Sequence, residues 1–572
     1  MLKHFLTLLF LMTFTLSAAE LQRGSFAVVF DKTLKPEDAK AASLKKQLPG
    51  DVKTFLMPGR FVYDLKILNP AYTPIKDAAL VSFEITAEQD EEIILGLGVD
   101  YWFTLFLNGE QIATSEPEGG GEIYENGFYV RQYNVSLKKG KNYFVMHTRP
   151  GTASWNIAIC NLSDLVTHGP YVFEVDRTTA AVALEYKIPL AVWLRYWEEG
   201  KEAEKKLCKS LTYGTIALKK QHRFELKGLK PDTVYHYEVL PAGKLDQQDA
   251  PSGSFKTLPA SGTGHVMTMI SDTQFTPAER VNVIRKFIKN GVFKDTDMLV
   301  SLGDVTSMFN DFNAAYFKTF LDVFRQAGVN APFYPVRGNH EFRGRDTDRY
   351  AEWFGRPYYA FRSGDVLYIV LDGGEDKPFR EKATYTWRTD TNSYVNEQKA
   401  WLEELVKSDL FQTAKVRVVL AHAPPFLWFG GWFSHKFERI AGCFMGENPA
   451  YKLDLWLCGH VHSPFRYDPV ADECSGPAPR NKKEKSEGVP IWDTDRIKFP
   501  VYINDGPGGR GGECSVFHLV AEGEKLHLKC IASSGKVLDY IVIERGKPFD
   551  VKETTFIKYD KHPSKKDKTK GK

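Results

Sequence analysis

The pattern of hydrophobic and polar positions changes about halfway along the chain. From residue 20 to residue 165, apolar and polar residues alternate in short runs, such as ALVSFEI at residues 79–85, and turn residues separate the runs. Alternation at period two predicts strands that bury one face. Residues 101–111 predict a hairpin, because Asn108-Gly109 favours a type I′ turn. We therefore expect a β-sandwich over residues 20–165.

A second β-rich unit is expected over residues 169–258. Residues 226–235, LKGLKPDTVY, fit the pattern Leu-x-x-Leu-x-Pro-x-Thr-x-Tyr and resemble fibronectin type III domains. In such sandwiches the tyrosine closes a corner by hydrogen-bonding back to the backbone, which here implicates Tyr235. Domains of this kind are supports far more often than active sites. Residues 259–264, PASGTG, are expected to form a linker.

From residue 265 onward the apolar runs become nearly continuous. Residues 298–300, 366–371 and 416–420 predict buried central strands, and helical stretches separate them. Alternation of strand and helix favours a layered α/β domain over residues 265–545. The predicted fold class is therefore multidomain, with two N-terminal β-sandwiches followed by an α/β sandwich of two mixed sheets flanked by helices.

The clearest helix is predicted to begin at Thr276. Pro277 occupies the first helical position and Glu279 completes a capping box. The helical spacing of apolar residues predicts which face packs on the core. That face consists of Val281, Ile284, Phe287 and Ile288.

The first 19 residues predict an export signal. Lys3 precedes an apolar run from Phe5 to Leu16, and small residues follow at positions 17–19. The run is shorter than a bilayer crossing requires, and no later run approaches about 18 apolar residues. We expect a secreted or periplasmic protein without a transmembrane segment.

Charge and cysteine content add little that is specific. The net charge of +3 reflects the end of the chain, where residues 558–572 carry seven lysines against two aspartates. No nucleic-acid-binding face is predicted, and residues 546–572 are expected to be a basic, disordered tail. The seven cysteines lack CxxC spacing, and Cys474 with Cys514 is a possible disulfide. Residues 471–498, rich in Pro, Gly, Lys and Glu, predict an exposed insertion.

Polar residues with metal-binding chemistry follow five of the apolar runs. Because strand ends converge on one crevice in layered α/β folds, these residues are expected to meet in space. Asp, Asn and His donors suit a pair of borderline divalent ions, and two metals sharing a carboxylate hydrolyse phosphate esters. The set predicts a metal-dependent phosphoesterase. Its members are Asp272, Gln274, Asp304, Asn339, His340, Glu341, His422, His460 and His462.

This series resembles the calcineurin-like metallophosphoesterases, whose pattern is D-x-H, GD, GNH-[DE], H and GHxH. The fibronectin-like unit upstream makes the pair similar to purple acid phosphatases, and residues 20–165 resemble galactose-binding-like sandwiches. The resemblance implies that Asp304 bridges two metals, that Asp272 and His462 bind the first, and that Asn339, His422 and His460 bind the second. It also implies that His340, oriented by Glu341, stands over the phosphate and protonates the leaving oxygen or stabilises negative charge.

The expected chemistry follows from the bridging carboxylate. Two cations held close lower the pKa of the water between them, and the resulting hydroxide attacks phosphorus. His340 can act as an acid because the ordinary pKa of histidine is about 6.5. The expected cofactors are two ions, with Fe, Mn or Zn preferred, and the expected substrates are phosphomonoesters or phosphodiesters.

One position departs from the family pattern. Gln274 stands where the general pattern has histidine. Purple acid phosphatases compensate with a tyrosine three residues after the bridging aspartate, but that place here is Ser307, so no iron–tyrosine pair is expected. We favour ligation by the Gln274 amide oxygen, which would bias the first site toward hard ions such as Mn²⁺ or Fe. The alternative is that Gln274 contacts the metal ligands without binding the metal, and that water fills the open coordination position.

Several aromatic residues have two interpretations each. Trp102 or Trp155 could stack on a sugar ring, giving the N-terminal unit a carbohydrate contact, or either could belong to the core. Trp428, Trp432 and Phe433 could stack on the organic part of a substrate or form a lid packed on a neighbouring domain.

Two further segments flank the motifs. Arg337 and Arg343 could reach phosphate oxygens or lie in solvent. The glycine-rich residues 505–512 lack the following GK[ST] of a P-loop and predict a tight turn near the metals.

Two rival functions remain at this stage. One is a phosphodiesterase specific for nucleotides or lipid headgroups. The other is a catalytically idle surface or carbohydrate-binding protein on the same scaffold, which Gln274 favours and which the presence of Asp304 and His340 opposes.

Overall fold

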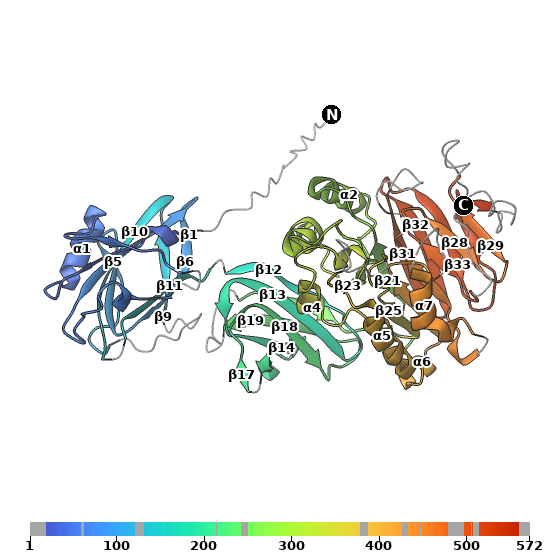
Figure 1. Ribbon diagram of the computed structural model, residues 1–572, viewed down its shortest axis with the longest axis horizontal. Coiled ribbons are helices and arrows are strands. Elements are labelled where there is room, and N and C mark those ends of the chain that lie inside the picture. Colours follow the sequence, from blue (N-terminus) through green and yellow to red (C-terminus); the bar gives the residue numbers. More distant parts are fainter. Residues whose placement is uncertain are drawn as a thin grey trace, which may run out of the picture.

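The computed structural model shows an elongated chain of three successive units, with the N-terminal sandwich at one end and the helix-containing unit at the other (Figure 1). This architecture confirms the predicted fold class. The residues described are 19–58, 62–119, 131–152, 154–163, 165–212, 214–241, 250–262, 264–377, 387–425, 433–446, 449–478, 497–504, 506 and 514–559. Residues 1–18, where most of the export signal is predicted, lie outside them.

The N-terminal unit is built from two antiparallel sheets that enclose a core. The larger sheet has the order β3-β2-β5-β10-β7-β8, with β1 on β5, and the smaller has the order β4-β11-β6-β9. Helix α1 (Pro36–Lys45) contacts β10 and β7 of the larger sheet. The strands are β1 (Glu20–Leu21), β2 (Ala27–Phe30), β3 (Lys53–Thr54), β4 (Val62–Asp64), β5 (Ala79–Ala87), β6 (Glu91–Val99), β7 (Trp102–Leu107), β8 (Glu110–Thr114), β9 (Arg131–Leu137), β10 (Gly140–Arg149) and β11 (Asn156–Asn161).

Local details of this unit match the sequence pattern. Asn108 and Gly109 join β7 to β8 with positive φ angles of 50° and 85°, as a type I′ turn requires. Trp155 is completely buried and packs on Phe30, so it belongs to the core. The Trp102 ring is covered by the Arg149 guanidinium, 4.7 Å from its centre. Carbohydrate contact through this unit stays a prediction.

The second unit contains the predicted tyrosine corner. The hydroxyl of Tyr235 accepts a hydrogen bond of 3.0 Å from the backbone N–H of Lys230. One of its sheets has the order β15-β14-β19-β20. The strands of the unit are β12 (Val166–Phe173), β13 (Thr179–Leu190), β14 (Val192–Glu198), β15 (Lys206–Lys209), β16 (Leu211–Thr212), β17 (Thr215–Ile216), β18 (Lys219–Lys227), β19 (Val234–Pro241) and β20 (Ser252–Lys256).

The other sheet of the second unit continues into the third unit. A ten-stranded sheet has the order β18-β13-β12-β23-β22-β21-β31-β32-β33-β34. The junction is a parallel pairing in which Phe173 of β12 lies beside Phe333 of β23 (Phe333–Pro335). The sheet is reinforced where the Tyr334 hydroxyl donates to the Val175 carbonyl at 2.7 Å. The second unit is therefore joined to the third by backbone pairing as well as by a connecting segment.

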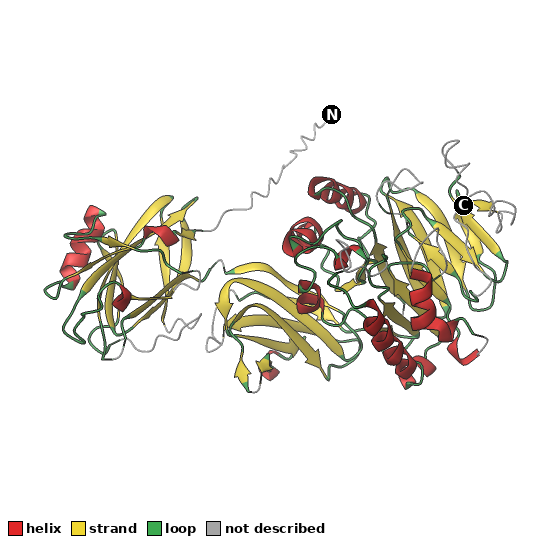
Figure 2. Ribbon diagram, viewed as in Figure 1, coloured by secondary structure: helices red, strands yellow, loops and turns green. Residues whose placement is uncertain are grey.

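The third unit packs this long sheet against an eight-stranded sheet of order β24-β25-β26-β27-β30-β28-β29-β35. Helices cover the outer faces of both sheets (Figure 2). Buried side chains from both sheets, including Val300, Tyr368, Leu420, Leu457 and Phe517, form one core. Because central strands are covered on both faces, β22, β25 and β26 are buried along their whole length, as their apolar composition predicts.

The elements of the third unit have these bounds. The strands are β21 (His265–Ile270), β22 (Met298–Ser301), β24 (Tyr359–Ser363), β25 (Val366–Leu371), β26 (Val416–Ala421), β27 (Leu455–Cys458), β28 (Phe465–Asp468), β29 (Glu473–Gly476), β30 (Val501–Ile503), β31 (Ser515–Glu522), β32 (Lys525–Ala532), β33 (Val537–Ile543), β34 (Asp550–Thr554) and β35 (Ile557–Tyr559). The helices are α2 (Pro277–Lys289), α3 (Asp322–Gln326), α4 (Arg349–Phe354), α5 (Thr391–Leu405), α6 (Asp409–Gln412) and α7 (Phe433–Ala441).

Helix α2 begins where the capping pattern predicts. Thr276 is the N-cap, and its side chain and that of Glu279 form the reciprocal capping box. Ile284 and Phe287 of the predicted face are buried. Arg280 is also buried, at 2% exposure, and its role lies in the site described below.

Two expectations near the end of the chain are wrong in part. The tail predicted to be disordered from residue 546 contains β34 and β35, which pair with β33 and β29. The predicted insertion at residues 471–498 contains β29, which is largely buried. Every residue of β34 is exposed, so its charged composition resembles that of a solvated tail although its backbone pairs with the sheet. Residues 479–496 and 560–572 lie outside the described residues.

The possible disulfide is not formed. In the part of the chain that the structure describes, all seven cysteines are thiols, so Cys474 and Cys514 are not bonded to each other. Among these same residues, no helix has the length and apolar composition that a bilayer crossing requires.

Candidate functional site

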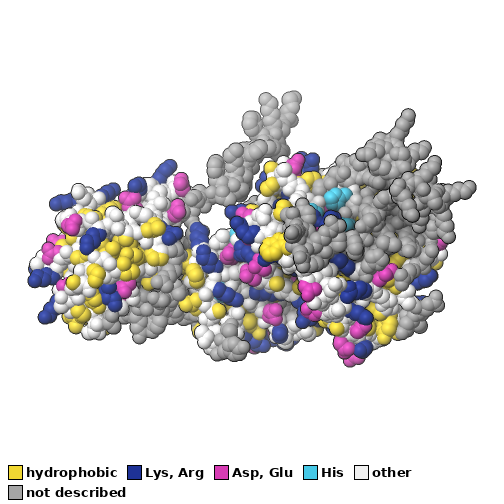
Figure 3. All heavy atoms as spheres, in the orientation of Figure 1, with side chains coloured by type: hydrophobic (Ala, Val, Ile, Leu, Met, Phe, Trp, Pro, Cys, Tyr) yellow, Lys and Arg dark blue, Asp and Glu magenta, His cyan; other side chains and the backbone are white. Residues whose placement is uncertain are grey.

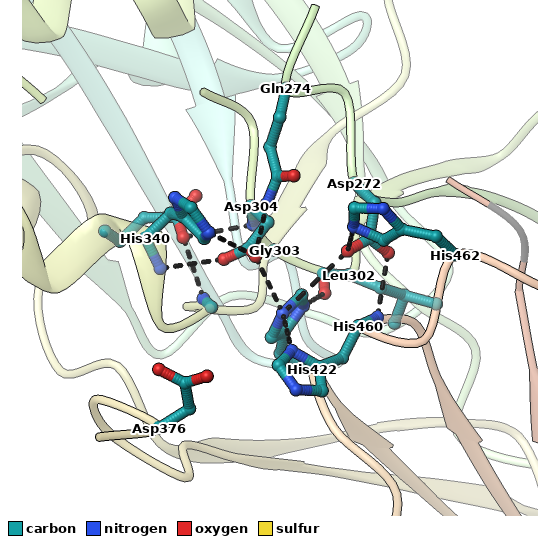
Figure 4. A network of polar contacts seen from close by, with 12 residues as sticks. Asp272, Gln274, Leu302, Gly303, Asp304, His340, Asp376, His422, His460 and His462 are labelled. Atoms are coloured by element: carbon teal, nitrogen blue, oxygen red, sulfur yellow. Dashed lines mark hydrogen bonds and ion pairs between the residues drawn. The ribbon is translucent and has the colours of Figure 1, made fainter. Parts of the chain in front are cut away.

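The predicted site residues lie at the ends of strands from both sheets of the third unit. Asp272, Asp304 and Asn339 follow β21, β22 and β23 of the ten-stranded sheet, while His422 and the 460–462 segment follow β26 and β27 of the eight-stranded sheet. Figure 4 shows Asp304 at the centre, with Gln274, His340 and His422 turned toward it. All nine predicted residues belong to one connected network of contacts.

Four of the predicted donors have unusual backbone conformations. Asp272, Asp304, His460 and His462 have φ angles of 51°, 56°, 72° and 56°. Non-glycine residues rarely adopt this left-handed region, and such strain gathers at functional sites. These turns come within four residues of the ends of β21, β22 and β27.

Glycines let the neighbouring backbone approach these carboxylates. A Cβ atom on Gly338 would lie 2.2 Å from Oδ1 of Asp304, and one on Gly459 would lie 2.3 Å from Oδ2 of Asp272. A Cβ on Gly506 would lie 2.1 Å from the Cβ of Asp272. These contacts explain why the motifs contain glycine. Gly506 is the single residue of the glycine-rich 505–512 segment that the structure describes.

The first group of donors comprises Asp304, Asn339, His422 and His460, here called the His422 cluster. Nε2 of His422 lies 3.1 Å from Oδ2 of Asp304 and 3.3 Å from Nδ1 of His460. Nδ1 of His422 donates to the Leu302 carbonyl at 2.7 Å, so Nε2 is the ring nitrogen that faces the cluster. One ligand atom each from Asp304, His422 and His460 lies within 4.8 Å of the others.

The amide of Asn339 completes this cluster. One of its terminal atoms lies 3.1 Å from Nδ1 of His460, 3.2 Å from Nε2 of His422 and 3.3 Å from Oδ2 of Asp304. The other lies 2.7 Å from Nη2 of Arg343. With nitrogen inward, the amide donates hydrogen bonds to the cluster. With oxygen inward, four electron-pair donors meet, and a cation satisfies all of them.

The second group comprises Asp272, Gln274 and His462, here called the Asp272 cluster. Oδ2 of Asp272 accepts a 2.9 Å hydrogen bond from the backbone N–H of His460. Oδ1 is buried, makes no hydrogen bond of good geometry with any described residue, and lies 3.3 Å from Nε2 of His462. A buried carboxylate oxygen without a donor, beside an imidazole nitrogen, fits a second cation.

Gln274 lies closer to the other group than the prediction implies. Its amide Nε2 donates to Oδ2 of Asp304 at 2.5 Å. The side chain therefore reaches the residue expected to bridge the clusters. Ligation by its oxygen requires the opposite orientation of the amide and stays a prediction.

The electrostatics of the site favour positive charge. Burial raises the pKa of Asp304, but His422 outweighs this effect and holds the pKa well below its ordinary range. Burial lowers the pKa of His422, and the Asp304 carboxylate reverses this effect and raises it to about 10. Burial and the charge of His422 lower the pKa of His460 to about 4. A proton on His422 thus balances the buried carboxylates, and a metal cation would compete with that proton for the same place.

His340 lies at the edge of the His422 cluster. Nε2 of His340 is 3.7 Å from Oδ2 of Asp304, and Nδ1 is 2.7 Å from the Ser307 carbonyl. A carbonyl only accepts, so Nδ1 carries the hydrogen and Nε2 faces the site. Nη1 of Arg343 lies 2.9 Å from this Nε2.

The expected orientation of His340 by Glu341 is not what the structure shows. Both oxygens of Glu341 accept backbone hydrogen bonds of 3.0 Å, from Gly338, Asp304 and Val305. The hydroxyl of Tyr316 also donates to Glu341 at 3.0 Å. Ser307 and Arg343 contact the His340 ring instead. Glu341 holds the loops on which Asp304 and Asn339 stand.

Arg280 is a site residue that the sequence analysis missed. From helix α2 it donates to the carbonyls of Thr273 and Phe275 at 2.9 Å and 3.3 Å, and to Oγ1 of Thr319 at 2.6 Å. It thereby holds the loop that carries Asp272 and Gln274. The sole signal in the sequence was one charged residue beside the apolar face of the helix.

Arg343 is buried and the side chain of Arg337 is 13% exposed, so the interpretation of these two arginines, which flank the GNHE motif, as solvated surface residues is wrong. Arg337 donates to Oδ2 of Asp372 at 2.6 Å, and its guanidinium lies 3.9 Å from the Phe342 ring centre. Arg343 is 7% exposed and contacts His340.

On the face of the molecule drawn in Figure 3, histidine side chains are visible beside lysine or arginine side chains. Trp428, Trp432 and the side chain of Phe433 lie outside the described residues.

Residues 266–464 match the family model of the calcineurin-like phosphoesterases. A search of curated proteins finds no match. Among solved structures, a purple acid phosphatase from yellow lupin (Lupinus luteus) seeds is 15% identical, with a TM-score of 0.43 and coverage of 82% of this chain and 93% of that one. The structure of PhoD is 12% identical, with a TM-score of 0.44 and coverage of 67% and 91%. A dimetal phosphatase from Danio rerio is 10% identical, with a TM-score of 0.32 and coverage of 49% and 98%.

Proposed function

We propose that this chain, a metal-dependent phosphoester hydrolase with a calcineurin-like phosphoesterase domain at residues 266–464, hydrolyses phosphomonoesters or phosphodiesters at a two-metal centre formed by the His422 and Asp272 clusters. The observation that carries the proposal is the position of Asp304. Its buried carboxylate contacts His422 of one cluster and Gln274 of the other.

The donor set fits two cations. One ion would be held by Asn339, His422 and His460. The other would be held by Asp272, Gln274 and His462. Asp304 would contact both ions. When bound, such a pair supplies Lewis-acid activation of water and neutralises the negative charge of phosphate oxygens. The mixture of carboxylate, amide and imidazole donors suits Fe, Mn or Zn.

His340 is the residue that we propose as the acid for the leaving oxygen. Because Nδ1 is committed to the Ser307 carbonyl, Nε2 is the nitrogen that takes up and releases the proton. Nε2 lies beside Asp304, the residue that joins the two clusters. Glu341 supports this arrangement by fixing the backbone of Asp304 and Gly338.

The proposal is tested with the purified full-length chain loaded with Mn²⁺, Zn²⁺ or Fe. Metal content is measured by mass spectrometry, and turnover is measured on para-nitrophenyl phosphate and bis(para-nitrophenyl) phosphate. Asp304→Asn keeps the shape of the side chain but removes its charge. It should bind less metal and lose turnover by about 100- to 1000-fold, as expected when one member of a buried charge pair is removed.

Asp454→Asn is the matched control. Asp454 is a buried carboxylate of the same domain that binds Arg545 rather than a predicted site residue. It should keep both metal content and turnover. Unchanged turnover in Asp304→Asn would exclude the proposed mechanism.

We also propose that the protein is exported, on the basis of Lys3 and the apolar run that follows it. N-terminal sequencing of protein recovered outside the cytoplasm should find Glu20 as the first residue. An intact Met1 on that protein would contradict cleavage of a signal.

A further inference from the structure

We propose that Arg343 binds the phosphate group of the substrate and makes the site prefer phosphomonoesters to phosphodiesters. This inference rests on the proposed function and adds a substrate class to it. The series of metal-binding motifs does not include Arg343 or the acidic loop that holds it.

One edge of the Arg343 guanidinium faces the catalytic side. Arg343 directly follows the short helix η5 (His340–Phe342), and its backbone N–H donates to the His340 carbonyl at 2.9 Å. Its Nη1 lies 2.9 Å from Nε2 of His340, the nitrogen proposed to exchange the proton. A phosphate group next to His340 therefore lies within reach of this N–H group.

The other edge is held by an acidic loop that follows β25. Nε and Nη2 of Arg343 donate to the two oxygens of Glu375, each at 2.8 Å. Nη2 also donates to Oδ1 of Asp376 at 2.7 Å. Such a bidentate fork fixes the plane of the guanidinium as well as its position.

The loop is itself anchored. Glu375 is completely buried, and Nζ of Lys436 from helix α7 donates to its carbonyl. Asp376 also pairs with Lys377. In Figure 4 the Asp376 carboxylate points toward His340 and His422. Arg343 thus lies between a rigid acidic support and the catalytic residues, and its orientation is set before a substrate arrives.

Arg337 provides a comparison in this part of the fold. Its guanidinium is 3.9 Å from the Phe342 ring centre and 5.3 Å from those of Tyr350 and Tyr394. Its Nε is bound to Asp372. The aromatic rings and Asp372 surround Arg337, whereas Arg343 contacts His340.

The chemistry of the two substrate classes decides the preference. A phosphomonoester has one more terminal oxygen and one more negative charge than a diester with the same leaving group. A fixed guanidinium forms charge-assisted hydrogen bonds with that extra oxygen. A diester presents an organic group at that place, which the guanidinium cannot bind. Arg343 should therefore stabilise a bound monoester more than a bound diester.

The test compares Arg343→Met with the unmodified chain, both loaded with metal. The kcat/KM values for para-nitrophenyl phosphate and methyl para-nitrophenyl phosphate are measured, along with the inhibition constant of inorganic phosphate. The variant should lose about 10- to 100-fold more in kcat/KM on the monoester than on the diester, and the excess loss should appear mainly in KM. The inhibition constant of inorganic phosphate should rise by about the same 10- to 100-fold.

Three further variants separate phosphate binding from folding. Arg343→Met leaves Glu375 buried without its partner, so Arg343→Met combined with Glu375→Gln should fold better and show the same loss on the monoester. Arg343→Lys keeps the charge without the fork and should recover part of the loss. Arg337→Met, the matched control, should lower the melting temperature but keep the ratio of monoester to diester kcat/KM.

The results that would overturn this inference differ from the result that would overturn the proposed function. If the unmodified chain hydrolyses neither ester, the proposed function fails, and calorimetric binding of inorganic phosphate to the metal-loaded chain then tests Arg343 alone. Equal losses on both esters, or an unchanged phosphate constant in the folded variants, would overturn the inference.

Discussion

The His422 cluster and the Asp272 cluster differ in how completely the protein surrounds their donors. In the first, Asp304, Asn339 and His422 are each 1% exposed, His460 is half-buried, and the imidazole of His422 is fixed by the Leu302 carbonyl. In the second, the side chain of His462 is 37% exposed, and Oδ1 of Asp272 lacks a good hydrogen bond from any described residue. We therefore expect the first cluster to hold an ion more tightly than the second, although Asp272 of the second cluster is completely buried.

The largest expected effect is that of removing His422. His422→Ala should lower the affinity of the first cluster for metal by about 100- to 1000-fold, because it removes one imidazole donor from the set that would hold the ion. The measurement is a metal titration of stripped protein followed by calorimetry. His527→Ala, a change at a half-buried histidine on β32, should leave the titration unchanged. A smaller loss in His422→Ala than in His462→Ala would reverse the comparison.

In protein that has been stripped of metal, a proton on His422 should take the place of the ion in the His422 cluster. The folded pKa of His422 is about 10, above the ordinary value of 6.5, because Asp304 outweighs the effect of burial. The stabilising contribution of protonated His422 to the free energy of unfolding is therefore complete below pH about 6.5. It is lost as the pH rises toward about 10.

The free energy of unfolding of stripped protein should fall by a few kcal/mol over that range. Denaturant titrations at several pH values measure this slope. Metal-loaded protein and His422→Ala should both lack it. A slope that survives in His422→Ala would assign the effect to another group.

The third effect concerns the incomplete donor set of the second cluster. Gln274→His supplies an imidazole in place of the amide that now contacts Asp304. The affinity of this cluster for Zn²⁺ should rise by about 10- to 100-fold, and its preference for Mn²⁺ should decrease. Competition titrations with the two ions measure the shift. Unchanged affinity and selectivity would count against a metal contact at position 274.

The donors of both clusters were predictable because their signals are local. Asp304 and His422 each come within a few residues of a fully buried, mostly apolar strand, so the run and the donor are neighbours in sequence. The rule that strand ends converge then brings them together. The same locality explains why the Thr276 cap and the Asn108-Gly109 turn were predicted correctly.

The supporting residues were not predictable, because their roles depend on distant partners. Arg280 contacts Thr319, and Glu375 contacts Arg343, which is 32 residues earlier in the chain. Each looks like an ordinary charged surface residue in the sequence.

The junction of β12 with β23 is equally non-local. It rests on a single pair of neighbouring residues, Phe173 and Phe333, and no turn motif announces it. The edge strand β34 was missed for a related reason, since exposed charged residues conceal backbone pairing.

The smallest effect sharpens the comparison most directly. His462→Ala removes the partly exposed donor of the second cluster and should weaken metal binding there by about tenfold, close to the value of a solvent-screened pair. Because the ion in this cluster is expected to exchange, excess metal should restore turnover to His462→Ala and fail to restore it to His422→Ala. The measurement is turnover as a function of metal concentration for both variants. Rescue of both variants at the same concentration would mean that the two clusters hold their ions equally, whatever their difference in burial.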